Sequence, residues 1–217
     1  LKASNTGAQD WFGNAVSLDG DTLAVGAKWE DSAATIINPP WGQGNNSSLN
    51  SGAVYIFTRS NGIWTQQAYV KASNAGEGAG FGNAVSLDGD TLAVGAYNEA
   101  SSGAGVGGKQ RRGLGILGSK DSGAVYIFTR SNGTWTQRAY LKASNAGSGH
   151  LFGTSVSLDG DTLAVGARGE TSGTTGFAGD QSENMANESG AVYVFTREGG
   201  VWSQQAYLKA SNAETRD

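Results

Sequence analysis

The sequence predicts an all-β protein made of three consecutive copies of one four-stranded antiparallel unit of about 70 residues. Three observations support this: nearly identical repetition, turn dipeptides at fixed places, and strands that are apolar on both faces. The block FGNAVSLDGDTLAVGA at 12–27 recurs letter for letter at 81–96, and recurs with two changes at 152–167. A second block, SGAVY, begins at Ser51, Ser122 and Ser189. A third block begins at Trp64, Trp135 and Trp202 and ends in KASN.

Turn residues divide each copy into four expected strands. In the first copy we expect strands at 12–18, 22–27, 53–59 and 64–72. The dipeptide Asp19-Gly20 separates the first two, and it is a strong hairpin signal because both positions tolerate positive φ. No segment keeps a 3.6-residue hydrophobic period, so we expect almost no helix.

The faces of these strands indicate how the sheets are buried. Within 53–57 the odd positions are Ala, Tyr and Phe and the even positions are Val and Ile, so both faces should be covered. Within 22–27 a face of Leu and Val opposes a face of Ala and Gly, which lets sheets stack closely. The fourth strand is more polar, and we expect Lys71 on its wet outer edge. Tandem sheets covered on both faces and ending on a wet edge are typical of propeller blades.

The repeat divides the chain into expected blades. We assign 10–74, 75–145 and 146–212 to blades one, two and three, 1–9 to the tail of a preceding blade strand, and 213–217 to a C-terminal tail. Known propellers close with about four to eight blades, so three would form an arc with two open faces. We expect these faces to be covered by further blades of the same parent chain or by self-association, as a closed oligomer or an open filament.

The chain resembles the FG-GAP repeats of bacterial surface proteins and integrin α-subunit heads. The resemblance rests on Phe12-Gly13, Gly26-Ala27, 52–55 and their equivalents, and it spans all three units. It implies a β-propeller, an extracellular location, and binding or adhesion. The calcium loop that the family often carries between its first two strands is replaced by a tight Asp-Gly hairpin, and the Pro of the family's GAP triplet is absent, so no calcium site is expected at that hairpin.

Composition excludes several function classes. The net charge of -4 disfavours nucleic-acid binding, and no apolar stretch is long enough for insertion into a membrane. The chain has no cysteine and a single histidine, His150, so thiolate chemistry and a His-based triad or zinc site are not expected. The repeated pair Asp19 and Asp21 is explained by turn formation. We therefore predict a protein that is not an enzyme.

Three long segments of differing composition join the second and third strands of each copy, at 28–50, 97–121 and 168–188. Long loops on a repeated scaffold are typical sites of ligand or partner contact. Candidate contact residues, for a surface glycan or a protein, are Trp29, Trp41, Lys109, Arg111 and Arg112. The repeated Trp64 and its equivalents could stack on sugars, but packing against a neighbouring blade is the preferred interpretation.

Each variable segment carries a Glu three residues after the repeated Gly-Ala pair. Oxygen ligands suit calcium, and the candidate ligands in the third segment are Glu170, Asp180, Glu183 and Asn184. The alternative is that these carboxylates accept hydrogen bonds from loop N-H groups. No other cofactor is expected. Glycosylation sequons begin at Asn45, Asn46, Asn132 and Asn187.

Two functions remain open at this point. The first is a non-catalytic, secreted or cell-surface scaffold or adhesive module that assembles through its blade faces, such as a subunit of a surface filament or appendage. The alternative is a lectin-like or protein-binding propeller that holds a ligand, and possible calcium, in its loops.

Overall fold

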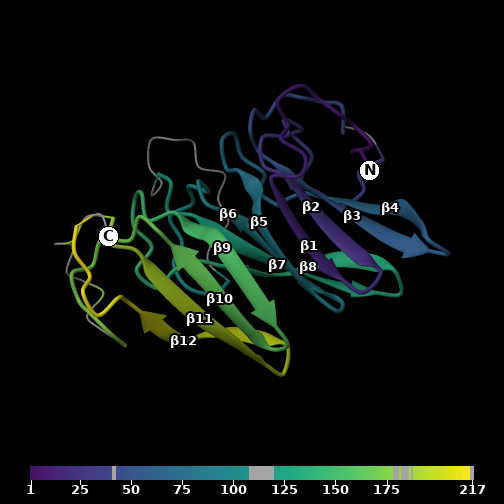
Figure 1. Cartoon of the computed structure of the whole chain (residues 1–217). Coiled ribbons are helices and arrows are strands. Elements are labelled where there is room, and N and C mark those ends of the chain that lie inside the picture. The colour runs from purple at the N-terminus through teal and green to yellow at the C-terminus, as the bar shows by residue number, and fades with distance from the viewer. Residues whose placement is uncertain (41–42, 108–119, 178–180, 182–185, 187, 216–217) are drawn as a thin grey trace.

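The protein folds into three four-stranded antiparallel sheets that follow one another in chain order (Figure 1). The first sheet contains β1 (Ala15–Asp19), β2 (Thr22–Ala27), β3 (Ala53–Ser60) and β4 (Ile63–Val70). The second contains β5 (Phe81–Asp88), β6 (Thr91–Ala96), β7 (Ala124–Ser131) and β8 (Thr134–Leu141). The third contains β9 (Phe152–Asp159), β10 (Thr162–Ala167), β11 (Ala191–Glu198) and β12 (Val201–Leu208). This is a computed structural model, and it describes residues 1–40, 43–107, 120–177, 181, 186 and 188–215.

The predicted all-β fold and the three repeated units are confirmed. No residue in the described ranges lies in a helix. Every sheet has the same meander, in which each strand pairs with the next one along the chain. The hairpin turns are those expected, with positive φ at Gly20 (53°) and at Asn61 (50°). The residues at these turns therefore set the strand register, pairing Asp19 with Thr22 in the first hairpin.

Two strand boundaries of the first sheet differ from the sequence expectation by more than one residue. The first strand of the first sheet begins at Ala15, whereas its counterparts begin at Phe81 and Phe152. Those two phenylalanines form parallel bridges to the preceding sheet, and the first sheet follows no other sheet in this chain. The fourth strand ends at Val70 rather than at residue 72, because Lys71 turns into the protein.

Each sheet has two distinct apolar faces. One, here called the aromatic face, carries Leu23, Val25, Tyr55 and Phe57 in the first sheet and the equivalent residues in the others. The opposite, aliphatic face carries Ala24, Val54, Ile56, Ala68 and Val70 and their equivalents. The prediction that both faces of the third strand are buried is confirmed in the first two sheets, where 53–57 and 124–128 are at most 2% exposed. It is wrong for the third sheet, where Val192 is 39% exposed.

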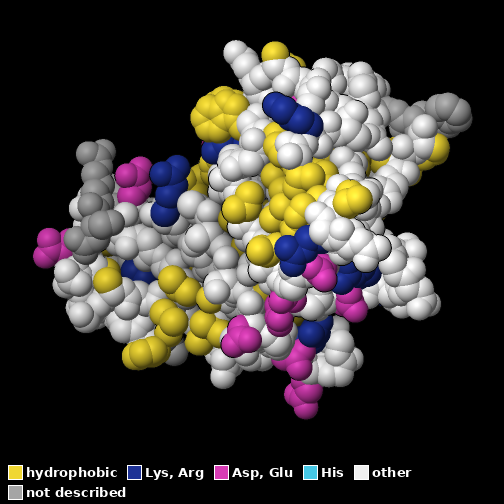
Figure 2. Space-filling model, turned by 45° about the vertical axis from the view of Figure 1, so that its right-hand side comes forward, with side chains coloured by type: hydrophobic (Ala, Val, Ile, Leu, Met, Phe, Trp, Pro, Cys, Tyr) yellow, Lys and Arg dark blue, Asp and Glu magenta, His cyan; other side chains and the backbone are white. Residues whose placement is uncertain are grey.

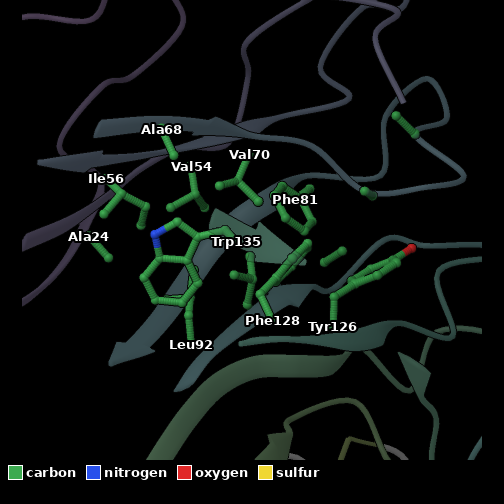
Figure 3. Packing of buried hydrophobic residues seen from close by; sticks show 14 of the residues in the cluster. Ala24, Val54, Ile56, Ala68, Val70, Phe81, Leu92, Tyr126, Phe128 and Trp135 are labelled. Atoms are coloured by element: carbon green, nitrogen blue, oxygen red, sulfur yellow. The ribbon is translucent and has the colours of Figure 1, made fainter. Parts of the chain in front are cut away.

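The hydrophobic core lies between sheets. The aliphatic face of the first sheet packs on the aromatic face of the second, where Trp135 lies beside Ile56 in a cluster that also holds Phe128 (Figure 3). The second and third sheets pack in the same way, with Ile127 and Leu141 facing Phe195 and Trp202. The sheets therefore stack with one polarity along the chain.

Glycines set the spacing between sheets. A Cβ built on Gly26 would collide with the backbone oxygen of Gly82 in the next sheet, and one built on Gly95 would collide with that of Gly153. No side chain fits at these points, because a backbone oxygen cannot move aside as a flexible side chain can. The Gly-Ala ending of the second strand is thus a contact surface for the Phe-Gly pair of the following unit.

Candidate functional site

The joints between sheets are the most elaborate repeated feature of the molecule. At the first joint Phe81 pairs with Gly52 in a parallel bridge, and Asn14 Nδ2 donates a hydrogen bond to the carbonyl of Gly82 at 3.2 Å. Phe81 also packs edge-on against Tyr126 of its own sheet, with ring centroids 5.4 Å apart. The Phe-Gly pair therefore lies between two sheets and contacts both of them.

Polar groups fix the register of neighbouring sheets at the other end of the joint. The amide of Leu87 donates to Ser17 Oγ at 2.9 Å, and the amide of Gly89 donates to Asp19 Oδ2 at 2.6 Å. Trp135 Nε1 donates to Gln67 Oε1 of the preceding sheet at 3.0 Å. The interpretation of the repeated Trp as a packing residue is confirmed at this position, where Trp135 is buried at 3% exposure.

An Arg-Asp pair lies at the first hairpin of each sheet, and in the second and third sheets its Arg also bonds the preceding sheet. Arg130 Nε lies 2.6 Å from Asp90 Oδ1, and its Nη1 donates to Thr22 Oγ1 of the first sheet at 3.1 Å. Turn formation thus explains only part of the role of these aspartates. The second Asp of each turn binds Arg, and the first Asp, as Asp19 shows, accepts a hydrogen bond from the next sheet.

A buried ion pair lies where each variable segment leaves its sheet. In the second sheet Lys142 Nζ lies 2.9 Å from Glu99 Oε2 and 2.7 Å from Ser122 Oγ. Tyr140 Oη also donates to Glu99 Oε2, at 2.8 Å, and desolvation by burial lowers the pKa of Lys142. The same pair recurs as Lys71 with Glu30 and Lys209 with Glu170. The expectation that Lys71 lies on a wet edge is therefore wrong, because its side chain is fully buried against a carboxylate.

The KASN segments after β4 and β8 each connect two sheets. Their Lys binds within its own sheet, whereas their Asn binds in the next one. Asn74 Nδ2 donates to Glu99 Oε1 at 3.1 Å, and Asn74 Oδ1 accepts from Tyr126 Oη at 2.6 Å. At the N-terminus Asn5 makes the equivalent bonds to Glu30 and Tyr55. Every Glu-Lys pair is thus completed by an Asn from the preceding KASN segment.

The outermost faces are exposed where the inner ones are buried. On the aromatic side Leu87 and Leu158 are 6% and 7% exposed, but Leu18 of the first sheet is 63% exposed. On the aliphatic side Val192 is 39% exposed, although both of its counterparts are fully buried. Figure 2 shows hydrophobic side chains gathered on the face that is turned forward, on the side of the N-terminal sheet.

The exposed face of the third sheet contains a pocket of about 510 Å³. Its lining includes Ser155, Gly166, Gly190, Val192 and Leu208. The equivalent positions of the first two sheets are those that receive the Phe-Gly pair of the following unit. A Cβ on Gly52 or Gly123 would collide with that Phe, whereas one on Gly190 would meet its nearest atom at 3.6 Å.

The structure places Trp29 beside Trp11, a residue that the sequence did not single out. Their ring centroids are 3.9 Å apart, and Lys28 Nζ lies 5.0 Å from the centroid of Trp11. Trp11 is 49% exposed and Trp29 is partly exposed. The two indoles and the ammonium group form a surface cluster at the start of the first variable segment. Trp41, Lys109, Arg111 and Arg112 lie outside the described residues.

Glu170 lies in the third buried ion pair. Its Oε2 accepts from Lys209 Nζ at 2.9 Å and from the amide of Ser172 at 3.1 Å, and its Oε1 accepts from Asn145 Nδ2 at 2.9 Å. The alternative of a carboxylate that binds loop N-H groups is therefore observed. Asp180, Glu183 and Asn184 lie outside the described residues, so the calcium site stays a prediction. Among the residues the structure describes, no three acidic, His or Cys side chains form a group suited to a metal ion.

The sequons are distributed over turns and long segments. Asn45, Asn46 and Asn132 are exposed, and Asn132 occupies the tip of the β7–β8 hairpin with φ of 50°. Asn187 lies outside the described residues. Glycosylation at these positions stays a prediction.

The joints identify the architecture, and comparison with known families agrees with them. The FG-GAP repeat model matches residues 1–57, 64–128 and 135–195, which together cover most of the chain. The chain belongs to the FG-GAP repeat family. The second match starts in β4 and ends in β7, so a family unit includes one complete joint between sheets. None of the curated proteins matches the chain.

As an FG-GAP protein the chain is a propeller-like repeat module. The propeller family is generally non-catalytic, and its repeats are typical of extracellular proteins. The described part of the chain holds no helix long and apolar enough to span a bilayer.

Proposed function

We propose that this FG-GAP protein is a non-catalytic extracellular scaffold or adhesive module that assembles through its sheet faces and displays its three variable segments. A subunit of a surface filament or appendage is the concrete form of this function. The FG-GAP family supports an extracellular role, and the fully repeated joints support a structural one. The Glu, Lys, Ser and Tyr groups of the ion pairs are buried and bind one another inside the sheets.

One observation carries this proposal. At one end the chain exposes Val16 and Leu18 on the aromatic side of the first sheet, and at the other end it exposes Val192 on the aliphatic side of the third. The internal joints bury the equivalents of Leu18 and Val192. Exposed apolar patches of this kind usually mark protein interaction sites on soluble proteins. Because the two faces differ, one copy would bind the next through unlike faces. Such a head-to-tail contact can repeat and form rings or filaments.

The test is the mass of the purified chain in solution. We expect light scattering to give species larger than one chain, with the fraction rising with concentration, and electron microscopy to show rings or fibres. A chain that stays monomeric at the highest soluble concentration contradicts assembly as part of its function.

The Trp11–Trp29 cluster favours the alternative, a lectin-like module. Exposed indoles can stack on sugar rings, and Lys28 adds a cation beside them. A glycan array, read with and without a chelator, separates the two functions. Reproducible binding that is lost in a Trp11→Ala and Trp29→Ala variant supports the lectin-like function, and calcium dependence in addition supports the predicted metal site.

A further inference from the structure

We propose that the pocket on the third sheet is the receptor for the Phe12-Gly13 segment of a second copy of this chain, so that copies join head to tail with the geometry of the internal joints. This inference rests on the proposed function and deepens it by naming the partner and both contact surfaces. The occupant follows from the chain itself, because the corresponding positions of the first two sheets receive the Phe-Gly pairs that begin at Phe81 and Phe152.

The receptor side keeps the glycines of the occupied joints, whereas Thr154 and Ser155 stand where the first two copies have Asn and Ala. Gly190 and Gly166 have the same places in the third sheet as Gly52 and Gly26 in the first. In the first sheet both glycines lie against the backbone of Phe81-Gly82. In the third sheet a Cβ on Gly166 would meet only the hydroxyl of Ser155, which is a movable side chain. The receptor therefore keeps its glycines and is open to another chain once the Ser155 hydroxyl turns aside.

The donor side of the first sheet matches as well. Leu18 and Val16 are each 63% exposed, whereas Leu158, the counterpart of Leu18, is 7% exposed at the second joint. Arg59 keeps its bond to Asp21, but its side chain is 47% exposed, against 18% for Arg130, which reaches the preceding sheet. The first sheet therefore presents the surface that the second and third sheets insert into a joint.

Polar partners are available on both sides. Ser17 Oγ and Asp19 Oδ2 accept amide hydrogen bonds at the first joint, and Ser86 and Asp88 do so at the second. Their third-sheet equivalents, Ser157 and Asp159, are exposed. They are placed to accept hydrogen bonds from Leu18 and Gly20 of the second copy. The proposed contact thus repeats the Ser and Asp hydrogen bonds of the internal joints, whereas the bond that Asn14 and Asn83 donate there has no Asn donor at Thr154.

Residues 1–5 compete with this contact. They read LKASN, the same letters as 208–212. Within one chain Asn5 binds Glu30 and Tyr55, which is the place that Asn212 of the other copy takes in a complete joint. Asn212 is exposed, whereas Asn74 in an internal joint is 8% exposed. Residues 1–5 therefore have to move aside, and they limit the strength of the association.

The test uses two variants of the full chain that each disable one surface. Leu18→Lys places a charge on the donor face. Gly166→Ala, made together with Ser155→Ala to remove the movable hydroxyl, fills the receptor with one methyl group. We expect each variant alone to be monomeric and their equimolar mixture to form a complex of one chain of each, because every variant keeps the surface that the other lacks.

The controls are Ser155→Ala alone and Ile63→Lys, a charge at an exposed position whose equivalents stay exposed in all three sheets. Both controls should associate as the unmodified chain does, and thermal unfolding verifies that each variant is folded. A mixture that stays monomeric while the unmodified chain associates overturns the head-to-tail contact and leaves assembly intact. An unmodified chain that does not associate contradicts the assembly itself.

A second measurement concerns residues 1–5. Asn5→Ala removes the bonds of this segment to Glu30 and Tyr55, so we expect association to become several-fold tighter. Adding Asn212→Ala should abolish that gain, because the other copy then has no Asn to supply. A gain that persists in the double variant, or no gain with Asn5→Ala, contradicts the competition between the two KASN segments.

Discussion

At the scale of single residues, the Glu-Lys pairs are the most demanding feature of the molecule. Taking two charges out of water costs several kcal/mol for each ion, and the ion pair offsets this only when its remaining hydrogen-bonding groups are satisfied. Here Asn74, Ser101, Ser122 and Tyr140 surround Glu99 and Lys142. Each of these side chains comes from a repeated position, so the pair is completed only when strand, variable segment and KASN segment all lie in place.

Replacing Glu99 by Gln should destabilise the protein strongly. The change leaves Lys142 buried without its carboxylate, and breaking a buried pair in this way costs about 3–5 kcal/mol. Urea unfolding measures the effect, and Glu77→Gln, at an exposed Glu on the neighbouring segment, is the matched control. Adding Lys142→Met should recover much of the loss; a loss that the second change does not reduce would show that burial of an unpaired charge is not its cause.

The pH dependence of this variant follows from the lysine. Desolvation already lowers the pKa of Lys142 in the folded protein, and removing Glu99 takes away the partner that opposes this effect. Between the lowered pKa of Lys142 in the folded protein and the unfolded lysine pKa of about 10.5, the unfolded chain binds more protons than the folded one. Stability therefore rises as pH rises through that window. The deficit of Glu99→Gln should therefore shrink on the alkaline side of neutrality, below the range in which the tyrosines ionise, and a deficit that stays constant there argues against a charged Lys142.

At the scale of elements, the strand pattern predicted the sheets well. The Asp-Gly and Asn-Gly turns mark the hairpins, and the apolar residues on both faces of 53–57 indicate sheets covered on each side. The ion pairs were harder to predict because Glu30 and Lys71 are far apart in the sequence, and a Lys at the end of a polar strand reads as exposed. The expected end of the fourth strand at residue 72 was wrong for the same reason: the sequence alone does not show that Lys71 turns inward after Val70.

The role of the joint glycines can be tested with a matched pair. Gly95→Ala puts a methyl group against the backbone of Gly153, whereas Gly166→Ala meets only the Ser155 hydroxyl. Overpacking of this kind costs about 1–3 kcal/mol, so Gly95→Ala should lower the free energy of unfolding by at least that amount and Gly166→Ala by much less. Chemical denaturation of the monomeric form compares them. Equal losses would mean that the effect comes from replacing glycine in a strand, rather than from the contact between sheets.

At the scale of the whole molecule, one chemical feature is shared by all three sheets. Six tyrosines lie in the aromatic faces beside the ion pairs, and all six are at most 2% exposed: Tyr55, Tyr69, Tyr126, Tyr140, Tyr193 and Tyr207. Burial is the main cause that raises the pKa of each of them above the ordinary value of 10, and the nearby Glu raises it further. Titration of these groups is therefore coupled to unfolding of the entire stack.

The protein should consequently unfold in a narrow alkaline range. Above pH 10 the unfolded chain loses its tyrosine protons while the folded chain keeps them, so the stabilisation is complete below that pH and declines above it, by about 1.4 kcal/mol per pH unit for each tyrosine. Six such groups remove a typical domain stability of about 5–15 kcal/mol within roughly two pH units. Tyrosinate absorbance and circular dichroism should change together, and Tyr97→Phe, at the partly exposed seventh tyrosine, should leave the midpoint unchanged. Tyrosinate that forms gradually while the sheets stay folded would show that the six hydroxyls are reached by solvent without opening the joints.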